Sequence, residues 1–73
     1  MVTIKIRGMS CEHCEAAVAE ALSAVPGVTN VEVRLKKLWE KESIATCEGV
    51  EDEIILWAAV EEAGYEPVEI TFT

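Results

Sequence analysis

Two cysteines separated by two residues, Cys11 and Cys14, are the side chains of this chain best suited to chemistry. They precede a segment with helical spacing of apolar residues, so we expect the pair at the start of a helix. Unpaired backbone N–H groups and the positive end of the helix dipole stabilise thiolates there. Two neighbouring thiolates with few other donors suit a soft d10 cation, which is Cu(I) first, with Hg(II) and Cd(II) as adventitious occupants. The pair therefore predicts a soft-metal site.

The donors near the pair do not complete a closed zinc site. Structural Zn(II) takes four ligands, usually from two Cys/His pairs, and only His13 and nearby carboxylates are at hand here. An open, low-coordinate site that exchanges its metal is therefore favoured, with Zn(II) as a less favoured occupant. His13 lies between the cysteines and is an auxiliary ligand candidate, although we expect it to point outward from a solvated first turn.

Two other interpretations of the cysteine pair stay open. One takes both cysteines as small apolar core residues, against which the neighbouring Glu12 and His13 indicate a solvated loop. The other is a glutaredoxin-like thiol oxidoreductase, which also places C-x-x-C after a first strand. Neither Pro26 nor Pro67 fits the cis-proline pattern that such an enzyme needs. We therefore expect that the chain is not an enzyme.

The third cysteine and the two tryptophans do not follow from the motif. Alternation places Cys47 with Ala45 on the strand face that helices should cover, so a buried apolar role is expected. Trp39 is a candidate for shielding the site or docking a partner, or for packing over the sheet edge. Trp57 lies in an apolar helix segment that must leave one face less covered, either for self-association or as ordinary exposed area.

Length, charge and cysteine count restrict the class of protein. The 73 residues allow one domain over 1–73. A formal net charge of −8, from 14 acidic and 6 basic residues, argues against nucleic acid and anionic lipid as partners. An odd number of cysteines argues against a disulfide scaffold and favours a reducing compartment, the cytoplasm. No apolar run approaches the ~18 residues of a membrane span, so no membrane insertion is expected.

Hydrophobic periodicity places the cysteine pair between a strand and a helix. Glycines and prolines separate the periodic segments. The expected elements are strand 2–7, helix 14–25, strand 28–35, strand 44–48, helix 52–63 and a last strand in which Val68, Ile70 and Phe72 alternate. This β-α-β-β-α-β order predicts an α+β, ferredoxin-like fold, with a four-stranded antiparallel sheet and two helices on one face.

The segment GMSCEHC at 8–14 is similar to the G-M-x-C-x-x-C motif of heavy-metal-associated domains. These domains occur in bacterial copper chaperones and at the N-termini of copper-transporting P-type ATPases. The resemblance extends over almost the whole chain, through VPGV at 25–28 and EEAGY at 61–65. It implies that Cys11 and Cys14 bind Cu(I) through sulfur, that Met9 braces the loop from the core without ligating, and that Tyr65 lies across from the loop.

The resemblance also implies a function and a partner. A copper chaperone of this kind holds one Cu(I) and passes it by thiolate exchange to a metal-transporting P-type ATPase or its metal-binding domain. The acidic surface suits a basic docking face on that partner. A chain that begins at Met1 and ends just after the last strand favours a free-standing chaperone over an ATPase domain. A mercury- or zinc-handling relative is an alternative, and a metal-bridged homodimer is a candidate assembly.

Overall fold

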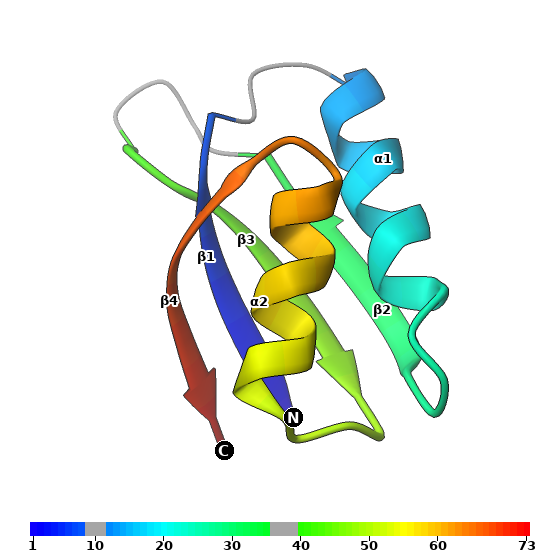
Figure 1. Ribbon diagram of the computed structural model, residues 1–73. Helices are drawn as coiled ribbons and strands as arrows, with labels where there is room; N and C mark the ends of the chain where they lie inside the picture. The colour runs from blue at the N-terminus through cyan, green and yellow to red at the C-terminus, as the bar shows by residue number, and fades with distance from the viewer. Residues whose placement is uncertain (9–11, 36–39) are drawn as a thin grey trace.

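Four strands and two helices make up the structure, a computed structural model that describes residues 1–8, 12–35 and 40–73, without the side chains of Glu12 and His13. The strands form one antiparallel sheet in the order β2-β3-β1-β4, and both helices cover the same face (Figure 1). The predicted ferredoxin-like fold is confirmed. In chain order the elements are β1 (Val2–Arg7), α1 (Glu12–Ser23), β2 (Thr29–Arg34), β3 (Ser43–Glu48), α2 (Glu53–Glu62) and β4 (Glu66–Phe72).

The core lies between the two central strands and the helices. In β1 and β3 every second side chain is buried, and the register joins these residues in three pairs across the strands. Both strands therefore present one face to the helices, as alternation requires. The pairs are Val2 with Cys47, Ile4 with Ala45, and Ile6 with Ser43. The helices complete the core with Val18, Leu22, Leu56, Ala59 and Val60.

The second helix begins and ends at residues that the sequence identifies. The Asp52 side chain caps α2, where one carboxylate oxygen accepts from the backbone N–H groups of Ile54 at 3.0 Å and Ile55 at 3.3 Å. These bonds satisfy two of the N–H groups that a helix start leaves unpaired. Gly64, with φ +95°, follows the last turn. The first helix begins at Glu12, so Cys14 lies in its first turn.

The edge strands depart from simple alternation. In β2, Asn30 takes a φ of 51°, and the pairing with β3 shifts between Thr29 and Glu32, which explains the irregular spacing of the valines there. In β4 the expected alternation is wrong at Val68. The register with β1 shifts between Lys5 and Ile6, so Pro67 pairs with Ile6 and is buried, while Val68 is exposed.

The topology divides the molecule into two ends. β1 ends at Arg7 and α1 starts at Glu12 at one end, which we call the motif end because it flanks the GMSCEHC segment. Helix α2 runs antiparallel to α1 and returns the chain to the motif end before β4, as Figure 1 shows. Both termini and the turns around Gly27 and Gly49 lie at the opposite end. Neither helix in the described part of the chain has the length and hydropathy of a membrane span.

Candidate metal site

Of the two motif cysteines, the structure describes Cys14. It lies in the first turn of α1, half-buried, with its side chain packed against the hydrophobic core. Cys11 and Met9 lie outside the described residues, and for His13 only the backbone, within α1, is described. A half-buried sulfur in a first helical turn is held by the core on one side and reachable from solvent on the other. That is a suitable position for a metal ligand that must also exchange.

Gly8 links the first strand to the motif. Its φ of +90° lies in a region that residues with a Cβ rarely adopt, and no atom of the described residues lies within 4 Å of the position that a Cβ would take. The requirement for glycine at this position is therefore one of backbone conformation and not of space. The turn directs the chain away from β1 just before the cysteine motif.

Tyr65 lies at the motif end, and the loop that it is predicted to face lies outside the described residues. The connection between α2 and β4, which contains it, lies at the same end of the molecule as the start of α1 in Figure 1. Tyr65 is half-buried against the core, and its backbone N–H donates to the carbonyl oxygen of Val60 at 3.3 Å. This bond ties the residue to the last turn of α2. The motif end is therefore built from the first turn of α1 and from the residue that follows α2.

Cys47 is a core residue, as predicted. Its side chain is fully buried, and it pairs with Val2 at the end of the sheet opposite the motif. Burial raises the pKa of the Cys47 thiol above its ordinary value, an effect that the positive N-terminal ammonium of Met1 partly offsets. The thiol therefore stays protonated at neutral pH and is a poor metal ligand and nucleophile.

The Cys47 thiol should make stability depend on pH in the alkaline range. The unfolded thiol ionises near its ordinary value of about 8.5, whereas the folded thiol keeps its proton to higher pH. The folded state then binds more protons, so the free energy of unfolding falls as pH rises through this window. Urea titrations between about pH 8 and 10 should show this fall, and Cys47→Val should reduce it. An identical slope in both proteins would contradict the assignment.

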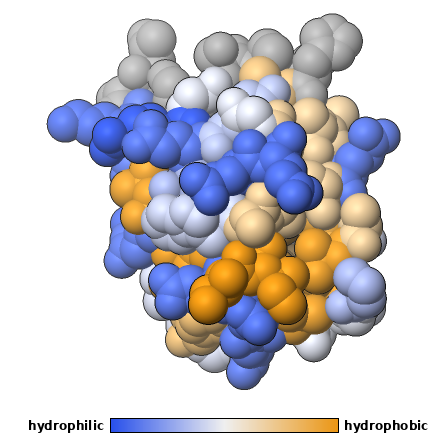
Figure 2. All heavy atoms as spheres, viewed as in Figure 1, coloured by the Kyte–Doolittle hydropathy of each residue, from blue (hydrophilic) through white to orange (hydrophobic). Residues whose placement is uncertain are grey.

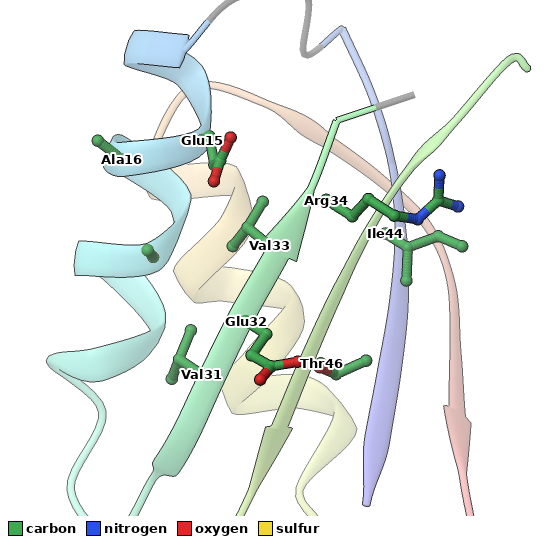
Figure 3. A pocket seen from close by; sticks show the side chains of 9 residues that line it. Glu15, Ala16, Val31, Glu32, Val33, Arg34, Ile44 and Thr46 are labelled. Carbon is green, nitrogen blue, oxygen red and sulfur yellow. The ribbon is translucent and has the colours of Figure 1, made fainter. Parts of the chain in front are cut away.

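A groove between α1 and β2 lies beside the site but brings no metal ligands together. In Figure 3, Glu15 projects from α1 toward β2, whereas Arg34 extends away from α1 across Ile44 of β3. The Arg34 guanidinium donates to both carboxylate oxygens of Glu40, at 3.1 and 3.2 Å. These hydrogen bonds and the Glu40 charge raise the pKa of Arg34. No group of three or more His, Cys, Asp or Glu side chains gathers as a metal site among the residues that the structure describes.

The structure also decides which face of α2 is uncovered. Leu56, Ala59 and Val60 are buried, whereas Ile54 and Ile55 are 80% and 46% exposed. Trp57 is half-buried. The uninterrupted apolar run around Trp57 predicted that one face of this helix is uncovered, but it did not identify which residues form that face. Trp39 lies outside the described residues, so its role stays a prediction.

Comparison with known proteins gives one consistent result. Residues 3–38 match the model of the heavy-metal-associated domain. The copper chaperone CopZ of Staphylococcus epidermidis is 39% identical over 67 residues, covering 86% of this chain and 90% of that protein. Copper-transporting ATPase 2 of Rhizobium meliloti is 43% identical over 63 residues, which cover 86% of this chain but 7% of the ATPase.

A solved structure supports the fold independently. It carries the description "Crosstalk between Cu(I) and Zn(II) homeostasis" and is 28% identical in sequence. The superposition has a TM-score of 0.69 and covers 93% of this chain and 96% of the other. The superposition therefore supports the ferredoxin-like arrangement of this chain.

Proposed function

The chain belongs to the heavy-metal-associated domain family, and on that premise we propose that it is a copper metallochaperone domain, residues 1–73, in which Cys11 and Cys14 hold one Cu(I). The observation that carries the proposal is the position of Cys14, half-buried in the first turn of α1 within the GMSCEHC motif. Cys11 precedes it by less than one helical turn in sequence. Two soft sulfur donors at low coordination number suit Cu(I) better than Zn(II).

Transfer proceeds by ligand exchange. A thiolate of the partner adds to Cu(I) while both cysteines of this chain are still bound, which gives a three-coordinate species. One cysteine then dissociates and takes up a proton, and a second partner thiolate replaces the other. Copper remains in its +1 state throughout, so no oxidant or reductant is needed. Because the metal is never released to solvent, the exchange is faster than dissociation followed by capture.

The proposed partner is a metal-transporting P-type ATPase or a metal-binding domain of one. The net charge of −8 favours association with a basic face, which acts on the association rate more than on affinity. The same sequence similarity supports a second assignment, in which this chain is itself the receiving domain of such an ATPase. Both assignments place the chain in the reducing cytoplasm and give it no enzymatic activity.

An anaerobic competition between metals tests the proposal. The reduced protein should retain one equivalent of Cu(I) against a chromophoric Cu(I) chelator and should lose Zn(II) to a zinc chelator of comparable strength. Tighter retention of Zn(II) or Hg(II) than of Cu(I) under matched conditions would identify a zinc- or mercury-handling relative instead.

The His13→Ala variant should retain Cu(I) as the wild-type protein does, since we expect this side chain to lie outside the ligand set. Turnover of a glutathione mixed disulfide would support an oxidoreductase.

A further inference from the structure

An exposed apolar groove runs along the two helices, from Pro26 and Ile54 at the end of the molecule opposite the motif toward Ala17 and Ala63. Ile54 is 80% exposed and Ile55 46%, and Ala58 follows them on the uncovered face of α2. The C-terminal part of α1 and the turn after it supply the facing wall. We call this surface the helix groove, and its principal residues are Ala21, Ala24, Val25, Ile54, Ile55 and Ala58.

The helix groove is separate from the proposed copper site. The motif ends at Cys14, in the first turn of α1, whereas the groove is lined on α1 from Ala17 onward and on α2 from Ile54 to its C-cap Ala63, so the two share no residue. Its most exposed apolar residues, Ile54 and Ile55, lie in the first turn of α2, at the end of the molecule opposite the motif. Metal binding therefore neither requires nor explains this surface.

Acidic side chains surround the apolar centre. Glu20 and Glu62 line the groove, and Glu53 and Glu61 flank Ile54 and Trp57 on its outer side. Figure 2 shows hydrophobic surface across the lower part of the helical layer, with hydrophilic side chains above and below it. Neither α1 nor α2 contains a lysine or arginine. The basic residues all belong to other segments, namely Lys5, Arg7, Arg34, Lys36, Lys37 and Lys41.

We propose that the helix groove docks a helix of a partner protein that presents apolar side chains flanked by lysine or arginine. An apolar helix face enters such a groove through residues spaced at i, i+3 or i+4, and i+7, while the flanking cations meet the glutamates and steer the encounter. A second copy of this chain would bring two acidic rims together, which costs affinity. An anionic membrane is repelled by the same rim.

An NMR titration of the nitrogen-15-labelled protein tests the proposal with a synthetic probe. The probe is a helical peptide with leucines at i, i+4 and i+7 and lysines on both sides of them. Two matched control peptides are used. One carries glutamates in place of the lysines, and the other carries the residues of the lysine peptide in scrambled order. The lysine peptide should shift the amides of Ala21, Ala24, Ile55 and Ala58 and leave Gly8 unmoved. The lysine peptide should bind with an affinity at least about tenfold higher than that of either matched peptide, and added salt should lower this affinity.

A pair of variants separates the groove from general apolar adhesion. Ile54→Gln combined with Ile55→Gln should weaken the lysine peptide at least about tenfold. Val68→Gln, which alters an exposed apolar residue on β4, should leave binding unchanged. All of these side chains are partly or largely exposed. Thermal unfolding followed by circular dichroism should confirm that each variant folds.

Four outcomes would overturn the proposal. The first two are an absence of amide shifts with the lysine peptide, and binding of the glutamate peptide as tight as that of the lysine peptide. The third is a concentration-dependent dimer that is lost in the variant with both Ile54→Gln and Ile55→Gln. The fourth is sedimentation of the protein with anionic vesicles that depends on the same two residues. None of these measurements involves metal. Failure of this proposal is therefore distinguishable from failure of the proposed copper site.

Discussion

Replacing Cys14 with serine is expected to lower the affinity for Cu(I) by at least about 100-fold. Loss of a residue that only orients a metal ligand already lowers metal affinity about 10- to 100-fold. Loss of a ligand itself should cost more, because the proposed Cu(I) site has only two. A serine hydroxyl is a hard, neutral donor and does not replace a thiolate on a soft cation. Anaerobic titration against a chromophoric Cu(I) chelator measures the loss, and Cys11→Ser should show a loss of similar size.

The third cysteine provides the matched control. Cys47 is fully buried at the opposite end of the sheet, so Cys47→Val should leave one Cu(I) bound with unchanged affinity. Because valine is apolar and of similar size, the fold should tolerate it at a cost below about 1.5 kcal/mol. Full Cu(I) binding by Cys14→Ser, or loss of the metal equivalent in Cys47→Val, would show that the proposed ligand pair is wrong.

Replacing Gly49 with alanine is expected to destabilise the fold by about 2–5 kcal/mol. Its φ of +98° costs a non-glycine residue about 1–2 kcal/mol. A Cβ at this position would also clash with the carbonyl oxygen of Gly27, which belongs to the turn after α1. Relief of that clash requires a backbone shift, for which overpacking gives a further ~1–3 kcal/mol. Chemical denaturation followed by circular dichroism measures the change.

Gly64→Ala separates the two contributions to this effect. Gly64 has a similar φ of +95°, but no atom of the described residues lies within 4 Å of the position that a Cβ would take. Its replacement should therefore cost only the conformational term, about 1–2 kcal/mol. In a domain of this size each kcal/mol lowers the melting temperature by roughly 4–8 °C, so the two variants should differ measurably. Equal destabilisation would mean that the close approach of the two turns contributes nothing.

Much of the fold could be predicted because its signals are local. Alternation in β1 and β3 predicted which side chains are buried, and the buried face is the one found. Asp52 and Gly64 mark the limits of α2 through hydrogen bonding and backbone conformation that involve only near neighbours. The same alternation correctly placed Cys47 in the core. The cysteine motif was identifiable because residues 8–14 are contiguous in sequence.

The features that could not be predicted depend on contacts between distant segments. Val68 is exposed because the β1–β4 register shifts, and a register is a property of two strands together. The sequence shows that α2 is apolar on nearly every side, but packing against α1 and the sheet decides that Leu56 is covered and Ile54 is not.

The sequence by itself therefore determined the order of the elements, the strand and helix faces that follow a simple period, and the cysteine motif. The tertiary structure decided the close approach of Gly49 to Gly27, the uncovered face of α2, and the helix groove that α1 and α2 form together. The physical reason is that periodicity and capping act over a few residues, whereas burial requires a neighbour. In this chain those neighbours come from the other helix or the sheet.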